Sequence, residues 1–470
     1  MITRKTLKDI RFWIFVLFII RLIGITNPPL EVGHNWRQTT VIMVARNFLE
    51  VDNNIFYPRI DIAGEKSGIT GMEFPLLNYL IYIIAKIFGY QHWYGRLINL
   101  IISSIGLFYF YKLIRKYFSE QVAFPSTIVL AVSIWFQFSR KIMPDTFSMS
   151  LITASIFFGS NYLENTLSKN NSLNLICYGV LMPLGVLSKL PSGFLLVIFV
   201  FFLFDRSIPI KRKVIFSTVS LIGVLPVIVW YYYWVPYLVD KYGFWHFFMG
   251  KGISQGFNEI LLNINETLSK FYDTALKFIG FGVFLFGLGY SFIKSDSKIL
   301  YLFILTFISF SIIILKAGFT FSHHNYYIIP FVPVMALVAG YGLSKIKYSK
   351  LAIILLIAIS VEGIANQQHD FRIKEKDMHL LNLEKDLDSM SFRNDLIIIN
   401  SGSYPTPMYF AHRKGWVNTN DKIRDEEYIM SLKGKGLKYI VILKRSFGTA
   451  TSLNRYRKVL ENEDYSIYEL

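Results

Sequence analysis

Long apolar runs, separated by short polar or basic segments, fill most of the first 365 residues of the chain. A transmembrane helix needs about 20 predominantly apolar residues. Runs that approach this length occupy residues 12–27, 94–114, 121–138, 146–163, 173–188, 191–205, 213–235, 274–293, 299–316, 326–344 and 350–365. We therefore predict a polytopic α-helical membrane protein with about eleven transmembrane helices.

One further run, residues 74–90, is apolar but short, has Pro75 as its second residue and contains Lys86. Its placement decides on which side of the membrane the basic loops lie. If it lies along the interface, four loops share a side with the basic N-terminus: Lys112–Lys116, Arg206–Lys213, Lys294–Lys298 and Lys345–Lys350. If it spans, all of them move to the opposite side. The positive-inside rule favours the interface, so we predict a cytoplasmic N-terminus and an extracytoplasmic C-terminus.

The composition changes after residue 366, where a charged helical stretch replaces the apolar runs. Residues 394–400, 437–444 and 464–470 have the character of strands, and residues 421–436 and 450–462 have that of helices. Alternating strands and helices indicate a small α/β domain. We predict two domains: residues 1–365, a transmembrane domain with a first extracytoplasmic loop at 28–93, and residues 366–470, an extracytoplasmic α/β domain.

Composition and charge narrow the class of protein. Hydrophobic residues make up 53% of the chain and aromatic residues 17%, which excludes an ordinary soluble protein. The net charge of +17 is concentrated in short loops beside apolar runs. That distribution is typical of membrane topology rather than of nucleic-acid binding. The lipid bilayer is therefore the expected partner, and nucleic acid is not.

The stretch from Glu31 to Tyr79 is more polar than the sequence on either side of it. Apolar residues recur at helical spacing over residues 36–49, which predicts an amphipathic helix on the membrane surface. Its amino-terminal end, where anions are favoured, carries His34, Asn35, Trp36 and Arg37. The alternative is that this stretch is a solvated loop.

Three further places carry candidate functional residues. Asp145 begins a predicted span, as a helix cap or as a buried functional acid. Lys189 lies between two spans, as a snorkelling side chain or as a cation for a lipid phosphate. His323 and His324 precede an aromatic pair, Tyr326 and Tyr327, and adjacent histidines make a poor metal chelate.

Several motifs occur in an order that resembles one family of membrane enzymes. They are MVARNF before residue 49, MEFPLLNYL with Glu73 and Tyr79, the span with Arg96, SRKIMPD, LSKLP and HHNYYIIPFVPVMAL. Over nearly the whole chain they resemble the protein O-mannosyltransferase and lipid A aminoarabinose transferase superfamily, of GT-C fold. The resemblance implies transfer of a sugar from a polyprenyl-phosphate donor to a glycolipid, polysaccharide or protein acceptor. The reaction would occur at the outer face of the bacterial cytoplasmic membrane.

The resemblance implies an inverting hexosyl- or pentosyltransferase and suggests a role for each candidate residue. The catalytic candidates are Asp145, Glu73, His34 and Glu31. The donor phosphate would be bound by Arg37, Lys189 and Arg96. Other substrate contacts would come from Trp36, Gln38, Tyr79, His323, His324, Tyr326 and Tyr327. No residue pattern demands a cofactor, and a requirement for a divalent metal ion stays open.

The first loop departs from the family pattern at one point. The family carries an acidic pair before the surface helix, and those positions hold Arg37 and Gln38 here. A guanidinium cannot serve as a base. The chain is then a non-catalytic relative or a subfamily with a different first-loop arrangement; retention of Glu73, Asp145 and Lys189 favours the second. A flippase of lipid-linked sugars and a polysaccharide polymerase or ligase are the alternative functions.

Overall fold

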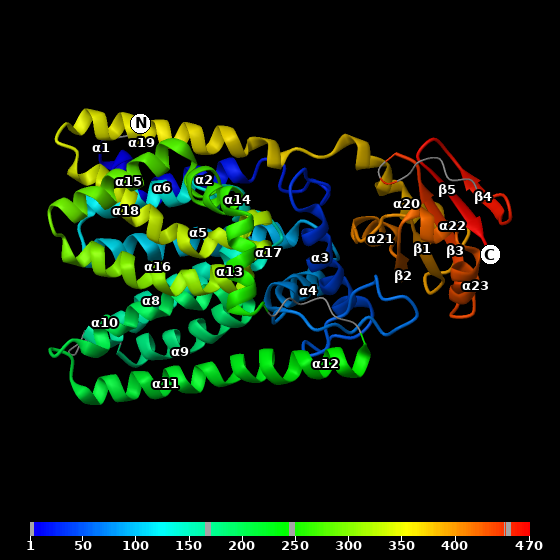
Figure 1. The fold of residues 1–470 in the computed structure, drawn as a ribbon, viewed down its shortest axis with the longest axis horizontal. Coiled ribbons are helices and arrows are strands. Elements are labelled where there is room, and N and C mark those ends of the chain that lie inside the picture. Colours follow the sequence, from blue (N-terminus) through cyan, green and yellow to red (C-terminus); the bar gives the residue numbers. More distant parts are fainter. Residues whose placement is uncertain (1–3, 165–170, 244–249, 446, 448–452) are drawn as a thin grey trace. The chain divides into compact units, whose positions relative to one another are not determined.

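The computed structural model describes residues 4–164, 171–243, 250–445, 447 and 453–470. Contacts divide the chain into two compact units (Figure 1). The helical unit comprises residues 1–25, 96–232 and 248–369, and the α/β unit comprises residues 26–95, 233–247 and 370–470.

The helical unit consists of α-helices interrupted by short 3₁₀ or π segments. Its first helices are α1 (Arg4–Leu7), α2 (Ile10–Arg21), α5 (Tyr94–Tyr117), α6 (Glu120–Val132), α7 (Trp135–Phe138), α8 (Pro144–Glu164) and α9 (Asn171–Ser188). They are followed by η1 (Leu190–Ile198), α10 (Phe199–Phe204), α11 (Ile210–Ile228), η2 (Val229–Trp234), α13 (Ile253–Leu262), α14 (Ile264–Ser269) and η3 (Lys270–Ala275). The last are α15 (Lys277–Ile293), α16 (Ser297–Ala317), α17 (Phe319–His323), η4 (Asn325–Phe331), α18 (Val332–Lys345), α19 (Ser349–Gln367) and η5 (Gln368–Phe371).

By length and composition, six helices in the described residues could cross a membrane, or seven if one bent pair counts as a single span. The six are Tyr94–Tyr117, Asn171–Ser188, Ile210–Tyr242, Ser297–Ala317, Asn325–Lys345 and Ser349–Phe371. The bent pair, Ile264–Ala275 with Lys277–Ile293, turns by 95° at a break where Lys277 has a φ of 61°. These segments coincide with seven of the predicted runs. The other four runs fall on α2, α6 with α7, α8, and η1 with α10, so the count of eleven stays a prediction.

Small residues allow the helices of this unit to pack closely. A Cβ at Gly340 of α18 would lie 2.0 Å from Ser126 Oγ of α6. The α15 and α18 backbones meet at Gly287 and Gly342, where an added Cβ would approach backbone atoms to within 3.0 Å. In lipid, helix association depends on such close van der Waals packing, because apolar side chains gain little by leaving lipid for protein.

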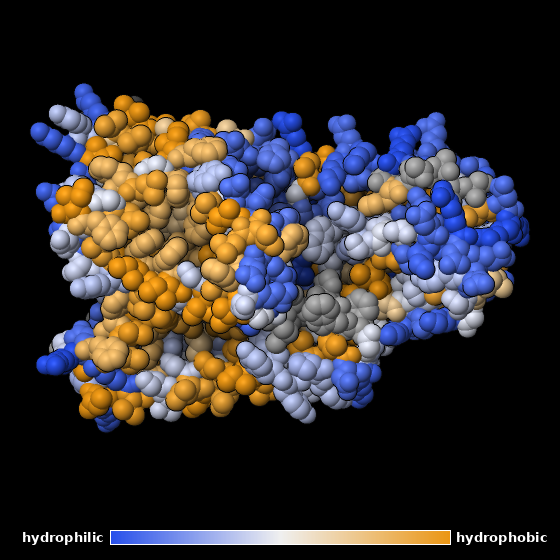
Figure 2. Space-filling model, in the orientation of Figure 1, coloured by the Kyte–Doolittle hydropathy of each residue, from blue (hydrophilic) through white to orange (hydrophobic). Residues whose placement is uncertain are grey.

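The outer surface of the helical unit is apolar. On α19, Ile353, Ile354, Ile357 and Val361 are each about three-fifths exposed. Figure 2 shows hydrophobic residues over most of the visible face of this unit. A contiguous apolar surface of this kind is suited to lipid rather than to water. The apolar surface and the several candidate spans are those of a multi-pass membrane protein.

The α/β unit begins with two helices and the loop between them, α3 (Asn35–Glu50) and α4 (Leu76–Phe88), and it also contains α12 (Val235–Tyr242). The predicted helix at 36–49 is confirmed as α3, but the prediction that it is amphipathic is wrong; its location at the membrane surface stays a prediction. Its buried residues lie on all sides and include Gln38, Thr40 and Arg46 as well as the apolar positions. Within the unit α3 packs against α4 and α21, so its polar positions are covered too.

The short apolar run at 74–90 forms α4. With 13 residues, α4 is about 20 Å long, well short of the roughly 30 Å hydrocarbon core. Ile83, Ile87 and Phe88 are exposed on it. Because α6 is equally short, the interfacial placement of α4 stays a prediction.

The end of the chain forms a five-stranded sheet of order β2-β1-β3-β5-β4. The strands are β1 (Leu396–Ile399), β2 (Gly415–Val417), β3 (Leu437–Leu443), β4 (Arg457–Glu461) and β5 (Tyr465–Glu469). β1 is parallel to β2 and β3, whereas β5 is antiparallel to β3 and β4. The helical segments are η6 (Glu375–Asn382), α20 (Leu383–Asp388), α21 (Thr406–Ala411), α22 (Asn420–Arg424) and α23 (Glu426–Lys433).

The strands predicted at 394–400, 437–444 and 464–470 are confirmed as β1, β3 and β5, and the helix predicted at 421–436 is confirmed as α22 and α23. The helix predicted at 450–462 is wrong, because residues 457–461 form β4; residues 450–452 lie outside the described residues. β4 pairs along its length with β5. Pairing to a neighbouring strand thus overrides the local helical preference of this charged segment.

Candidate functional site

A buried ion pair joins the start of α3 to the segment that precedes α4. Nη2 of Arg37 donates to Oε1 of Glu73. Arg37 is 8% exposed and Glu73 is 5% exposed. A charge buried so far from water needs a compensating partner, and each of these two groups supplies one for the other. The pairing brings together a predicted phosphate-binding cation and a predicted catalytic acid.

Glu31 and Gln38 form a second buried contact in the same unit. Nε2 of Gln38 donates to Oε2 of Glu31 at 2.9 Å, and Glu31 is 1% exposed. The backbone around Glu31 pairs with residues 372–374: N–H of Val32 donates to the Arg372 carbonyl, and N–H of Lys374 donates to that of Leu30. These bonds fix the Glu31 carboxylate beside the first turn of α3.

The remaining predicted residues of this unit lie on α3 or α4, or next to them. His34 immediately precedes α3 with a left-handed φ of 61°, and its carbonyl accepts from the N–H groups of Arg37 and Gln38. The Trp36 carbonyl accepts from Thr40 Oγ1 at 2.8 Å. Tyr79 packs edge-on against Phe48, with ring centroids 5.5 Å apart.

The helical unit contains a comparable pair. Nζ of Lys189 lies 3.7 Å from Oδ1 of Asp145, with side-chain exposures of 14% and 4%. Asp145 lies inside the first turn of α8, which begins at Pro144, and not at the preceding cap position. Lys189 occupies the extended residue between α9 and η1. Two alternatives were predicted for Asp145, a helix cap and a buried functional acid. In the structure it is a buried acid next to a cation.

The Lys189 ammonium group contacts an aromatic ring. Its Nζ lies 5.3 Å from the centroid of the Tyr326 ring, within cation–π range. Tyr326 stacks on Tyr327 and on His324, with centroids 5.0 and 5.3 Å apart. His323 is different, because it is exposed and its Nδ1 lies 3.0 Å from the Phe319 carbonyl. Of the four predicted aromatic and histidine residues, Tyr326 contacts Lys189, and Tyr327 and His324 stack on Tyr326.

Arg96 is fully buried in α5, and its Nη1 donates to the Ile25 carbonyl at 3.1 Å. Two arginines that the sequence analysis did not select are buried in the same unit. Arg140 donates to the carbonyls of Ile23 and Gly24, and Arg21 donates to Ser139 Oγ. The signal was present, since Arg21 stands within an apolar run and Arg140 stands in the SRKIMPD motif.

Arg46 was also missed, although it belongs to the MVARNF motif. Its guanidinium donates to Asp61 Oδ2 at 2.9 Å and to the Tyr409 carbonyl at 3.0 Å, and it lies 4.7 Å from the centroid of the Tyr409 ring. The Tyr409 and Tyr90 hydroxyls are 2.8 Å apart. This network ties α3 to α21 and accounts for the burial of a charged residue.

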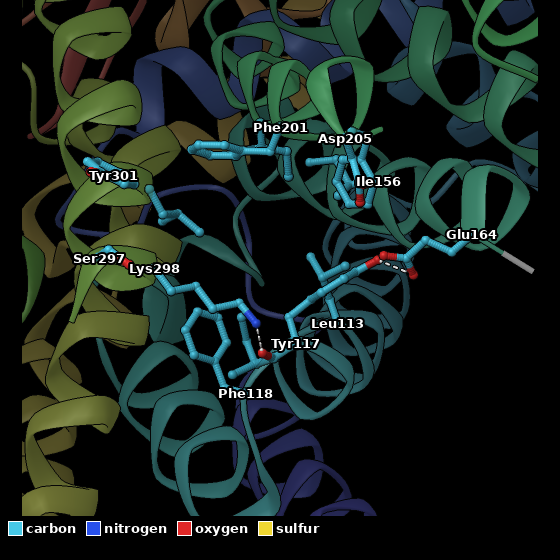
Figure 3. A pocket seen from close by; sticks show the side chains of 14 residues that line it. Leu113, Tyr117, Phe118, Ile156, Glu164, Phe201, Asp205, Ser297, Lys298 and Tyr301 are labelled. Carbon is cyan, nitrogen blue, oxygen red and sulfur yellow. Dashed lines mark hydrogen bonds between the residues drawn. The ribbon is translucent and has the colours of Figure 1, made fainter. Parts of the chain in front are cut away.

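A separate cavity of about 440 Å³ lies in the helical unit among the ends of α5, α8, α10 and α16 (Figure 3). Its walls are mainly apolar, and Glu164, Asp205 and Lys298 contribute charged groups. None of the predicted site residues lines it. Within the described part of the chain, no group of three or more His, Cys, Asp or Glu residues is arranged to hold a metal ion.

Comparison by sequence gives one family match. The profile of the family described as dolichyl-phosphate-mannose-protein mannosyltransferase matches residues 73–230, about a third of the chain. No curated protein matches the chain by sequence.

Comparison by structure covers nearly the whole chain. ArnT from Cupriavidus metallidurans in the apo state superposes with a TM-score of 0.62 at 11% identity, covering 97% of each chain. ArnT bound to undecaprenyl phosphate gives a TM-score of 0.60 at 10% identity, covering 97% of this chain and 98% of that one. The archaeal oligosaccharyltransferase AglB from Archaeoglobus fulgidus, with an inhibitory peptide and a dolichol-phosphate, gives 0.55 at 14% identity and covers 92% and 69%. The resemblance predicted from the motifs is thereby confirmed at the level of the fold.

Proposed function

We propose that this protein is a glycosyltransferase that uses a polyprenyl-phosphate-linked sugar as donor. The observation that carries the proposal is the fold, which matches ArnT over 97% of this chain, including the form bound to undecaprenyl phosphate. The mannosyltransferase family match over residues 73–230 supports it independently. So do the buried cation–carboxylate pairs Arg37–Glu73 and Lys189–Asp145, since buried ionisable groups in such proteins mark functional positions.

The proposed reaction is an in-line displacement at the anomeric carbon of the donor, with inversion. The bond from this carbon to the acceptor oxygen forms while its bond to the phosphate oxygen breaks. The electron pair leaves with the polyprenyl phosphate. A leaving phosphate gains negative charge, which cations stabilise more strongly in a buried site than in water. We assign this role to Arg37 and Lys189, and Arg96 is a weaker candidate because a backbone carbonyl holds it.

The acceptor hydroxyl loses a proton as the new bond forms, and a carboxylate is suited to receive it. Asp145 and Glu73 are the proposed acids for positioning or deprotonating the acceptor, with His34 or Glu31 assisting in place of the missing first-loop pair. Trp36, Tyr79, His324, Tyr326 and Tyr327 are proposed to contact the sugar or the lipid. No step of this scheme requires a metal ion.

The proposed location is the outer face of the bacterial cytoplasmic membrane, with the N-terminus inside and residues 366–470 outside. This orientation places every strongly basic loop of the helical unit in the cytoplasm, as the positive-inside rule requires. Eleven spans give that result, with α4 left out of the count.

The decisive experiment is a transfer assay with purified protein, a radiolabelled polyprenyl-phosphate sugar and extracted membrane lipids. We expect label to pass from the donor to an acceptor. Arg37→Lys should weaken donor binding about tenfold or more, because lysine cannot offer two parallel hydrogen bonds to a phosphate. Arg393→Lys, at an exposed arginine of the same unit, is the matched control and should bind the donor normally.

A flippase would give a different result in the same preparation. It would move the labelled donor across a vesicle membrane and return it chemically intact. Movement without consumption of the donor by the parent protein would therefore replace the transferase proposal. Mass spectrometry of glycolipids from cells that lack the gene would identify the sugar and the acceptor, which separates single-sugar transfer from polymerase or ligase activity.

A further inference from the structure

A small polar cavity in the α/β unit is not used by the proposed reaction. Its volume is about 230 Å³, and it lies where the start of α3, the segment around η6 and the start of α21 meet. The polar residues that line it are Asn35, Lys374, Lys376, Asp377, Tyr404 and Thr406. Sites for drug-sized ligands are usually about 300–1,000 Å³, so this cavity suits a single sugar ring rather than an oligosaccharide.

The side chain of Asn35 is the first indication that this cavity binds a ligand. Asn35 is 95% buried, because only 5% of its surface is exposed, and it lines the cavity. Its side-chain amide has no hydrogen-bond partner among the residues that the structure describes. Its polar atoms are accessible from the cavity rather than enclosed by protein, so the amide presents two donors and an acceptor to whatever occupies it. A hydroxyl or carboxylate in the cavity would satisfy it.

Two lysines give the cavity a positive charge. Within the described residues, neither Lys374 nor Lys376 has a carboxylate or a hydrogen-bond acceptor at its ammonium group. The backbone of Lys374 is fixed, since its N–H donates to the Leu30 carbonyl and its carbonyl accepts from Asp377. The two lysines outnumber the one carboxylate that lines the cavity, that of Asp377, and an excess of positive charge favours a ligand that carries negative charge.

The other lining groups favour a sugar over a simple anion. The buried Asp377 carboxylate can only accept hydrogen bonds when ionised, which suits sugar hydroxyl groups. The Thr406 hydroxyl, 3.2 Å from that of Thr39, can donate or accept. The Tyr404 ring, 47% exposed and packed on Phe447, offers an apolar face to a sugar ring.

We propose that this cavity binds a sugar unit of the acceptor that carries an anionic group, a carboxylate or a phosphate. Lys374 and Lys376 bind the anionic group, Asn35 and Thr406 bind neighbouring oxygens, and Asp377 accepts from hydroxyl groups. Asn35 is two residues before Arg37 in α3, so a sugar held here lies at the end of the helix that carries a proposed donor contact. The assignment as an acceptor site rests on the proposed transferase function; the binding of an acidic sugar does not.

Binding to the full-length protein in detergent tests the proposal directly. The probes are a glucuronic-acid-containing disaccharide, a hexose phosphate, a neutral disaccharide and inorganic phosphate alone, each measured by calorimetry. We expect at least one acidic sugar to bind about tenfold or more tightly than both the neutral disaccharide and inorganic phosphate. The relative affinity of the two acidic probes tells a carboxylate from a phosphate. Equal binding of neutral and acidic sugars, or equal binding of inorganic phosphate, would overturn the proposal.

Variants locate the binding. Lys374→Gln with Lys376→Gln should weaken the acidic sugar about tenfold or more, whereas Lys385→Gln, at an exposed lysine of the same unit, should leave it unchanged. Lys376→Gln alone replaces an exposed side chain, so this single variant can be used for the binding measurement if the double variant does not fold. Unchanged binding in a folded variant would overturn the assignment to this cavity.

The two proposals fail in different ways. If the acidic sugar binds in a lysine-dependent manner but no donor sugar is transferred, the proposal that the cavity binds an acidic sugar is supported and the transferase proposal is wrong. If transfer proceeds and the lysine variants affect neither the Michaelis constant for the acceptor nor sugar binding, the transferase stands and this cavity is not its acceptor site.

Discussion

At the scale of single residues, Asp145 is the sharpest test of the proposed chemistry. It is buried in the first turn of α8, and the Lys189 ammonium group lies 3.7 Å away. Asp145→Asn keeps the size of the side chain but removes the charge. We expect turnover to fall by about 10²–10⁴-fold, the usual scale for a general acid or base, with normal expression. The measurement is the transfer assay.

The matched control is Asp205→Asn, which changes an exposed aspartate of the same unit and should leave turnover unchanged. If the protein carrying Asp145→Asn modifies its acceptor at the parent rate, Asp145 has no part in proton transfer. Its pair with Lys189 is then structural.

The first loop supports a second prediction at this scale. Glu31 is fixed by Gln38, and His34, with an unperturbed pKa of about 6.5, can exchange a proton near neutral pH. Glu31→Gln and His34→Asn should each lower turnover while donor binding stays intact. Asn is chosen at position 34 because it tolerates the left-handed φ that His34 adopts. The transfer assay measures turnover, and a separate binding experiment measures the affinity for the donor.

If Glu31→Gln and His34→Asn both turn over at the rate of the unmodified protein, the base is not in this loop. The acceptor would then be an anion that needs no base, such as a phosphate.

The sequence named candidate site residues, but it did not predict the partners with which the structure pairs them. Glu73, Asp145 and Lys189 were selected from motifs, yet the Arg37–Glu73 pair joins positions 36 residues apart. Such pairings depend on how α3 and α4 pack, which local periodicity does not encode. Arg46 was missed for the same reason: its partners Asp61 and Tyr409 come from a loop and from α21.

At the scale of elements, periodicity predicted where helices and strands lie, but tertiary contacts decided how they are used. The residues 36–49 do form a helix, yet packing against α4 and α21 buries its polar side as well. Residues 457–461 had a helical composition and became β4, because β5 offers a hydrogen-bonding edge. Both errors come from reading a segment without its neighbours.

His412, at the end of α21, joins three elements and supports a prediction about pH. Its Nδ1 lies 2.7 Å from Glu384 Oε1 of α20, and its Nε2 lies 2.7 Å from Glu50 Oε2 of α3. Burial opposes protonation of the imidazole, but hydrogen bonds to Glu384 and Glu50 outweigh it and raise the pKa of His412. The hydrogen bond from His412, opposed by burial and assisted by the bond from Arg393, lowers the pKa of Glu384 to about 2.

The sign of the pH effect follows from these shifts. A raised histidine pKa contributes stability that is complete below the unfolded pKa of about 6.5 and is lost as pH rises through the folded pKa. The lowered carboxylate pKa contributes stability above about 4.3 that is lost on acidification towards 2. The contact is therefore strongest between these limits.

We expect His412→Asn to lower the thermal unfolding temperature most near pH ~5.5, and progressively less as the pH rises past about 7. Asn is chosen because it tolerates the left-handed φ of 47° that His412 adopts. Unfolding of the full protein in detergent, followed by intrinsic fluorescence over this range, measures the difference. His369→Gln, at an exposed histidine, is the control and should show no such trend. A pH-independent difference would mean that His412 acts through packing and not through charge.

At the scale of the whole molecule, charge distribution predicts an orientation in the membrane, which span length alone does not. Length and composition single out six or seven crossing helices among the described residues, because segments such as α2 and α6 are only 12 and 13 residues long. A count that requires a long, continuous and apolar helix does not include a span that is broken, bent or rich in buried serine. The basic loops are unaffected by such breaks, so they remain the better guide to orientation.

The orientation is itself testable. With eleven spans and α4 along the interface, the chain ends outside, so a reporter that fluoresces only in the cytoplasm should stay dark when fused after Leu470. The same reporter fused after Asp296, within the basic segment that follows α15, follows eight predicted spans and should be bright. That control shows that the reporter works in this protein and in this membrane. A bright fusion at Leu470 would mean an even number of spans. The outer-face assignment of the α/β unit would then fail, and with it the proposed acceptor site at Lys374 and Lys376, since an extracytoplasmic acceptor could not reach a cytoplasmic cavity.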